Sequence, residues 1–212
     1  NNDNLWLFGA STAEIWYATG DKDLPFARMQ GTYVQAGCIA AQSIAKMGSS
    51  VIWLASSQIG RGQVVMTEGY QPQRISTHAI EAAIARYTRI DDAYAFAYQD
   101  QGHGFYCITF PTAAVTWVYD LTTQLWHQRS YWQNGRHYQH RARYHAMLGK
   151  KHLVSDHANG KLYQLSHESV TDDGAQIVRE RTCSAVGDGT LVRHGMVTLQ
   201  AKTGAAGLVD RE

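Results

Sequence analysis

The chain has 212 residues, of which 44% are apolar and 11% aromatic, so it is long enough to bury a substantial core. Its 19 Lys and Arg side chains nearly balance its 18 Asp and Glu side chains, and the formal net charge of +1 excludes the strongly basic composition typical of general nucleic-acid binders. No apolar run approaches the roughly 18 residues that a membrane span needs, and no signal peptide is recognisable. We therefore expect a folded protein without a membrane segment.

The amino-terminal residues predict the end of a β unit rather than its beginning. Strands are expected from Leu5 to Phe8 and from Glu14 to Ala18, with a glycine-containing turn between them. Trp6 lies 47 residues before Trp53, which occupies the equivalent place in the next unit. We interpret residues 1–30 as a partial unit. This start and the missing initiator Met predict a piece of a longer polypeptide.

The next unit is predicted over residues 43–76. Short apolar runs alternate with glycine turns in the order expected of four antiparallel strands. The expected strands cover residues 43–46, 51–55 and 63–67, with turns at residues 48–50 and 60–62 and a closing piece near residues 72–76. The glycine-bracketed stretch before this unit, residues 31–37, is interpreted as a crossing between units.

Residues 77–88, with the sequence THAIEAAIARYT, interrupt the β pattern. Ile80, Ile84 and Tyr87 recur at helical spacing, Thr77 is suited to cap the amino terminus, and Glu81 falls in the first turn. These features predict one short helix inserted between two units. We favour packing over the rim of the fold for this helix, and contact with a neighbouring subunit is the alternative.

Residues 92–130 carry the clearest unit, with four strands and three turns. In the first strand Tyr94, Phe96 and Tyr98 alternate with alanines, which suits a strand packed against neighbours on both faces. The remaining strands are expected over residues 105–110, 115–120 and 125–129, separated by a turn at residues 100–104, a break after Pro111 and a turn at Asp120. The last strand is more polar, as expected for an outer edge.

The last unit is predicted over residues 144–182. Its strands are expected over residues 144–148, 152–155 and 161–166, with turns at residues 149–151 and 156–160. The first strands of the three units begin at residues 43, 94 and 144, so the repeat spacings are 51 and 50 residues. Strand-like runs at residues 176–183 and 191–200 complete no further unit, and residues 183–212 are interpreted as a β-rich carboxy-terminal extension.

These repeats predict an all-β fold, namely a β-propeller of antiparallel four-stranded blades with a period of about 50 residues, as in kelch-type blades. The blades are assigned to residues 1–182, with the short helix over 77–88 as an insertion. One partial and three further blades do not comfortably close a propeller, which typically has about four to eight. We therefore expect an incomplete propeller.

The sequence contains no arrangement of reactive side chains that indicates catalysis. Cys38, Cys107 and Cys183 are odd in number and far apart, so reduced thiols are expected. His137 and His140 lie three residues apart, but no acidic or sulfur ligand recurs at a matching spacing. We predict a protein that is not an enzyme and holds no metal and no cofactor.

Two alternative functions depend on other side chains of the blades. A carbohydrate-binding propeller would stack sugar rings on Trp126, Tyr131 and Trp132. A propeller hydrolase would need two carboxylates that converge on a central channel. The carboxylates available for such a pair are Glu14, Glu68, Asp91, Asp92 and Asp120.

One basic cluster stands out between the last two units. It consists of Arg136, His137, Arg141, Arg143, Lys150 and Lys151. Basic side chains interleaved with aromatic ones contact phosphates and stack on bases, so these six residues are the candidate contacts for a partner or for DNA. An ordinary solvated strand between blades is the interpretation that we favour.

Three segments carry a resemblance to a known family. They are GYQPQRISTHAIEAAI (residues 69–84), DAYAFAYQDQGHGFYCITFPTAAVTWVYDLTTQLWHQRS (92–130) and GKKHLVSDHANGKLYQLS (149–166). In sequence, order and spacing they are similar to the packaged-DNA stabilisation proteins, also called tail hubs or tail accessory factors, of Salmonella-phage-type short-tailed bacteriophages. Members of that family are about twice as long as this chain.

The resemblance implies a structural protein of the phage tail that is made in the bacterial cytoplasm and resides in the virion. It implies a homo-oligomeric ring, a hexamer in the family, without a membrane partner. Such a ring connects the portal and its adaptor to the tail needle and the tailspikes, lies close to DNA and retains the packaged genome. The residues themselves predict only the propeller.

Overall fold

The computed structural model of the chain describes residues 4–57 and 60–182. The strands of its amino-terminal half are β1 (Asn4–Phe8), β2 (Ala13–Ala18), β3 (Phe26–Val34), β4 (Gly37–Cys38), β5 (Ala45–Met47), β6 (Ser50–Ser57), β7 (Gly60–Glu68) and β8 (Gln71–Arg74). The strands that follow are β9 (Tyr94–Asp100), β10 (His103–Phe110), β11 (Val115–Asp120), β12 (Leu125–Gln133), β13 (Arg136–Gln139), β14 (Ala142–Leu148), β15 (Lys151–Asp156), β16 (Leu162–Leu165), β17 (Thr171–Asp172) and β18 (Ala175–Gln176). One α-helix, α1 (His78–Ile84), and one 3-10 turn, η1 (Ala41–Ser43), interrupt them.

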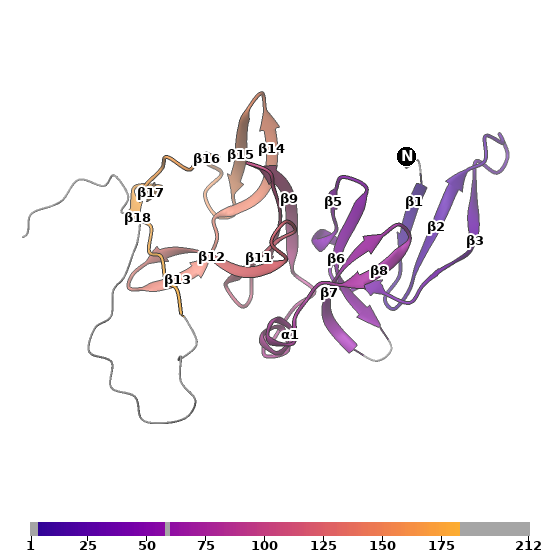
Figure 1. Ribbon diagram of the computed structural model, residues 1–212, viewed down its shortest axis with the longest axis horizontal. Helices are drawn as coiled ribbons and strands as arrows, with labels where there is room; N and C mark the ends of the chain where they lie inside the picture. Colours follow the sequence, from indigo (N-terminus) through magenta and orange to yellow (C-terminus); the bar gives the residue numbers. More distant parts are fainter. Residues whose placement is uncertain (1–3, 58–59, 183–212) are drawn as a thin grey trace, which may run out of the picture.

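The first three of four antiparallel sheets follow one another along the long axis of the molecule, and the fourth lies beside the third (Figure 1). The first sheet contains β1–β3, the second β4–β8, the third β9–β13 and the fourth β14–β16, and the small hairpin β17–β18 comes last. The predicted all-β architecture of consecutive antiparallel sheets is confirmed. Among the described residues the sheets form an open series and not a closed ring.

The third sheet shows how side-chain alternation positions its neighbours. Phe96 and Tyr98 belong to the apolar cluster shared with the fourth sheet, whereas Ala95 and Ala97 pack on the other side, against the cluster shared with the second sheet. Small side chains let the second sheet approach closely, and aromatic rings fill the wider gap. The four expected strands are present, and β13 pairs with β12 as a fifth.

The second sheet differs in detail from the sequence-based expectation. Residues 41–43 form η1 and the first strand begins at Ala45, because the Ser43 hydroxyl donates to the Ala40 carbonyl at 2.7 Å and accepts from the Leu54 amide at 3.0 Å. The turn expected at residues 60–62 lies within β7. There Gly62, with φ +82°, accompanies a register shift in the pairing with β6.

Three apolar clusters fill the three gaps between successive sheets. Ile15 and Trp53 lie in the cluster between the first and second sheets, and Leu54 and Tyr106 in the cluster between the second and third. Val154 lies in the cluster between the third and fourth sheets. The first strands of the last three units, β5, β9 and β14, lie next to one another. This is the face-to-face packing of propeller blades.

The predicted helix is present but shorter than expected. The Thr77 hydroxyl accepts a hydrogen bond from the Ile80 amide and so caps α1, while Ile80 and Ile84 face the core. The expected range, residues 77–88, is wrong at its end because the chain leaves the helix after Ile84 in tight turns. Glu81 forms an ion pair with Arg74 at 2.7 Å, which fastens the helix to the edge of the second sheet. No helix among the described residues is long and apolar enough to cross a membrane.

The two ends of the series also depart from the expected boundaries. β3 runs on to Val34, past the expected end of the first unit at residue 30 and into the expected crossing at residues 31–37. After β16 the chain forms the separate hairpin β17–β18, and residues 177–182 form no strand. The expected extension over 183–212, with its strand-like run at 191–200, lies outside the described residues.

Each end sheet has a face without a neighbouring sheet in the described part of the chain. Leu5 and Leu7 lie on the outer face of the first sheet with 44% and 43% of their surface exposed. Tyr144 and Leu162 lie on the outer face of the fourth sheet with 55% and 71% exposed.

Candidate functional site

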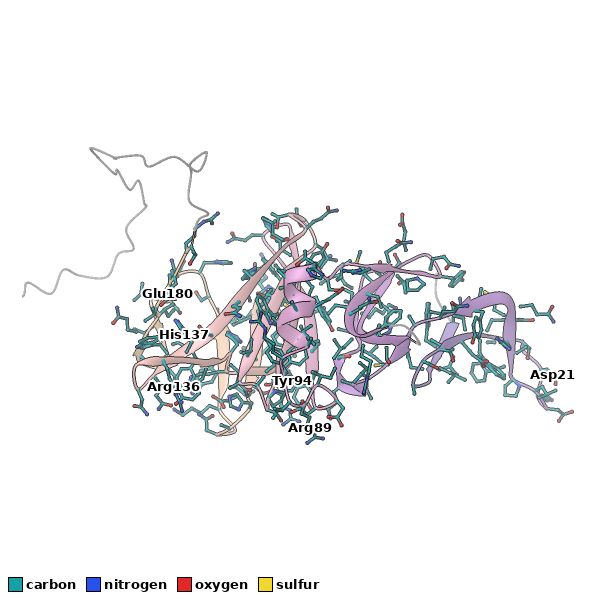
Figure 2. The ribbon with its side chains drawn as sticks, turned by 90° about the horizontal axis from the view of Figure 1, so that it is seen from below. Asp21, Arg89, Tyr94, Arg136, His137 and Glu180 are labelled. Carbon is teal, nitrogen blue, oxygen red and sulfur yellow. The ribbon has the colours of Figure 1, made fainter. Side chains whose placement is uncertain are left out.

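The structure divides the predicted basic cluster among three environments. Arg136 and His137 lie on β13, at the end of the molecule opposite Asp21 (Figure 2). Arg136 is exposed, and its guanidinium lies 4.5 Å from the centre of the Tyr138 ring. His137 accepts from or donates to the Ser130 hydroxyl at 2.7 Å and lies 3.3 Å from the Glu180 carboxylate. These two residues form the accessible part of the cluster near the carboxy-terminal hairpin.

Arg141 is held inside the fold by acidic partners. Its guanidinium donates to the Asp156 carboxylate at 3.1 Å and lies 3.7 Å from both Asp172 and Asp173. It also lies 3.9 Å from the centre of the Tyr131 ring. Because its charge is already balanced by carboxylates, this arginine ties the fourth sheet to β17–β18.

The remaining members of the cluster lie apart from these. Arg143 is wedged between the rings of Tyr94 and Tyr144, at 5.4 Å from each centre. Lys150 and Lys151 are exposed at the turn between β14 and β15. In Figure 1 this turn lies well away from the hairpin of β12 and β13. The six residues thus form no continuous basic surface.

A cavity opens where the third sheet extends beyond the fourth. The third sheet continues from β11 to β12 and β13, whereas the fourth ends at β16, so the small hairpin β17–β18 and not a further strand of the fourth sheet faces β12. The cavity has a volume of about 820 Å³. Its walls come from β12, β13, β16 and residues 171–180, and its polar side chains include His127, Arg129, His137, His140, Arg141, Asp172, Asp173 and Glu180.

Arg129 is the distinctive cation of this cavity. Its guanidinium donates to the Tyr98 hydroxyl and lies over the Phe105 ring at 4.9 Å, yet no carboxylate of the described residues lies within ion-pair distance of it. Loss of water, and next the charge of Arg129, lower the pKa of His127 below its ordinary value. The same two causes are the largest that lower the pKa of His140 to about 4. Arg129 therefore lies in the cavity beside two imidazoles, those of His127 and His140, whose neutral form is favoured.

The sequence interpretation missed Arg129 and His127 as site residues. Strand alternation places both on the face of β12 that continues the row of Phe96, Cys107 and Val118 across the third sheet. That alternation was readable in the sequence. The shorter fourth sheet, which leaves the two side chains facing a cavity, was not.

A second cluster of polar side chains joins the third and fourth sheets. His145 and His152 contact each other at 2.9 Å, and the Tyr98 ring lies 5.1 Å from His145. Asp100 contacts His167 at 2.7 Å and lies 3.8 Å from His152. These groups form a chain rather than a converging set. Within residues 4–57 and 60–182, no group of three or more His, Cys, Asp or Glu side chains is placed to hold a metal ion.

The aromatic side chains considered for sugar binding make contacts within the protein. The Trp126 indole donates to the Ile75 carbonyl at 2.9 Å and packs on Tyr119. Tyr131 lies against Arg141, and Trp132 meets the His137 ring edge to face at 4.6 Å. These contacts indicate packing roles.

The carboxylates considered for hydrolysis are distributed over three sheets. Glu14 accepts from the Trp16 indole at 3.1 Å on the first sheet, and Asp92 accepts from Thr112 at the start of the third. Asp91 pairs with Arg89 at 2.6 Å, and Asp120 caps its turn and contacts His103 at 2.8 Å. Four of the five carboxylates thus have a local partner, and Glu68 is exposed at the end of β7 in the second sheet.

The stacked sheets define the class of this protein as an all-β protein built from consecutive antiparallel blades. A family model described as Phage_stabilise, Bacteriophage P22 Gp10, beta-propeller, matches residues 1–170. The chain belongs to this phage stabilisation family. No curated protein matches the chain. Membership supports a structural role in a phage particle.

Proposed function

We propose that the protein is a structural component of a phage tail that connects the portal and its adaptor to the tail needle and tailspikes and retains the packaged DNA. The observation that carries this proposal is the family match over residues 1–170. The proposal includes a ring of identical copies, a place in the virion after synthesis in the bacterial cytoplasm, and no turnover of a substrate.

The fold supports such a mechanical role. The three apolar clusters, which include the fully buried Trp53 and Tyr106, join the four sheets into a rigid series. Each sheet contributes turns at its ends and an edge strand at its rim, so a rigid series holds several partners at once. The exposed tip with Arg136 and the turn with Lys150 are two such contact points.

Genome retention tests the proposal directly. Phage particles assembled without the protein are expected to release their DNA after packaging, and supplying the protein is expected to restore full heads, as counted by electron microscopy and nuclease-resistant DNA. In parallel, the full-length protein mixed with its cognate portal complex is expected to add ring-shaped density beneath the portal. Full heads in the absence of the protein, or no added density, would refute the proposal.

A further inference from the structure

We propose that the cavity between β12 and the β17–β18 hairpin binds a compact oxyanion of the phosphate class at Arg129. Its volume of about 820 Å³ falls within the range of roughly 300 to 1,000 Å³ typical of small-ligand sites. This inference concerns a ligand site within one chain and is independent of the role in the phage tail.

The surroundings of Arg129 favour an anion at that side chain. On the acidic wall, Arg141 contacts Asp156 and lies 3.7 Å from Asp172, and Lys161 contacts the Asp173 carboxylate at 3.0 Å. Arg129 on the opposite wall has a hydroxyl and aromatic rings as its described partners. A partly desolvated guanidinium without a counterion gains a strong charge-assisted contact when an oxyanion arrives.

The surrounding groups supply further donors for the anion. Imidazole side chains line the cavity beside Arg129, namely His127, His137 and His140. Glu180 reaches His137 at 3.3 Å and is the carboxylate of the chain that an incoming anion must outcompete at this position. An oxyanion at this position therefore meets the Arg129 guanidinium and imidazole N–H groups.

Anion binding is expected to take up protons. The pKa values of His127 and His140 are lowered partly by the charge of Arg129, and a bound anion offsets that charge and raises both values. Desolvation also raises the pKa of Asp172, one of the carboxylates that line the cavity. Because the pKa values of both histidines start below the ordinary histidine value of about 6.5, the apparent affinity for the anion should rise as the pH falls from 7 to 5.5.

Sulfate is the probe for this dependence because its own charge is constant over that range. Calorimetric titration of the full chain with sodium sulfate, against sodium chloride at equal ionic strength, should show saturable binding that strengthens on going from pH 7 to pH 5.5. Arg129→Gln should weaken it by roughly tenfold or more, since the charged contact is lost. Arg136→Gln, an exposed arginine outside the cavity, should leave it unchanged.

A second variant has the opposite expected sign and does not depend on Arg129. Glu180→Gln removes the competing carboxylate and should strengthen sulfate binding by about twofold or more. Binding that is equal in wild type, Arg129→Gln and Glu180→Gln, or no binding beyond chloride, would overturn the proposal. A 5′-phosphorylated oligonucleotide compared with its unphosphorylated form then distinguishes a nucleic-acid end from a free phosphate as the source of the oxyanion.

Discussion

At the residue scale, His140 shows how placement controls protonation. Its ring Nδ1 accepts a hydrogen bond from the Ala142 amide at 3.2 Å, which requires the neutral imidazole. Desolvation and then the charges of Arg129, His157 and Arg141 lower the pKa of His140 to about 4. Near pH 6.5, where a histidine of the unfolded chain takes up its proton, His140 of the folded protein is therefore still neutral.

This shift predicts a specific loss of stability in acid. Because the folded pKa is below the unfolded value of about 6.5, the unfolded state binds more protons, and stability falls as the pH drops from about 6.5 toward 4. Between pH 7.5 and 5 the contribution of His140 to the free energy of unfolding should fall by about 2 kcal/mol. Urea unfolding of wild type and His140→Asn at both pH values measures it. The asparagine variant keeps an acceptor without titrating, and an unchanged pH dependence would contradict the prediction.

Gly37 is a position where the lack of a Cβ atom lets the backbone of residues 10 and 11 approach closely. A Cβ atom at this residue would lie within 3.0 Å of the backbone of Ser11 and Ala10, closer than real contacts allow. The neighbouring Cys38 amide donates to the Gly9 carbonyl at 2.9 Å, so the turn of the first sheet is bonded directly to the start of the second.

Replacing this glycine should therefore open the joint between the first two sheets. We expect Gly37→Ala to lower the free energy of unfolding by about 3 kcal/mol, because backbone rather than a flexible side chain must move. Gly104→Ala is the matched control, since its added Cβ would meet side chains at ordinary contact distances of 3.5 Å and beyond. Urea denaturation of both variants tests the expectation. Equal losses would show that close approach is not the cause.

At the element scale, the fold is a series of sheets joined by gap-filling side chains. Trp53 is fully buried between the first and second sheets, where its indole donates to the Gly37 carbonyl at 3.0 Å and meets the Phe8 ring edge to face at 5.0 Å. Between the third and fourth sheets, the rings of Tyr98, His145 and His152 have the same role. Each gap has its own set of contacts.

Because each gap is filled by its own apolar cluster, a substitution in one cluster should destabilise only the two sheets that it joins. Trp53→Ala should lower the free energy of unfolding of the first and second sheets by about 3 to 5 kcal/mol, because it leaves a large cavity between them. Amide hydrogen exchange followed by mass spectrometry should then show faster exchange in β1 and β2 and little change in β10 and β11. Contacts between neighbours alone give this gradient. Uniform acceleration across all four sheets would show instead that the series unfolds as one unit.

At the scale of the whole molecule, the described sheets form one continuous series. The first and fourth sheets lie at opposite ends of the series (Figure 1), and their outer faces carry exposed apolar side chains such as Leu7 and Leu162. The basic side chains that the sequence groups together are divided among a hairpin tip, a turn and the interior. Contact with large partners would accordingly use several separate points of the surface.

Much of this architecture was predictable because it is local. The alternation at Tyr94, Phe96 and Tyr98 and the glycine turns depend on neighbouring residues, as do the Thr77 cap and the repeat of about 50 residues. The boundaries at Val34 and Ile84 were mispredicted because pairing with β2 extends the strand and tertiary packing ends the helix.

The sequence by itself determined the all-β character of the chain, its blade period and the faces of its strands, since strand alternation and turn chemistry act over a few residues. Only the tertiary structure decided which charged side chains form ion pairs inside the fold and which have no oppositely charged partner. Arg141 is balanced by Asp156 across two strands, whereas Arg129 faces a cavity because the fourth sheet stops at β16. The electrostatic state of a side chain depends on partners distant in sequence, and folding alone brings those partners together.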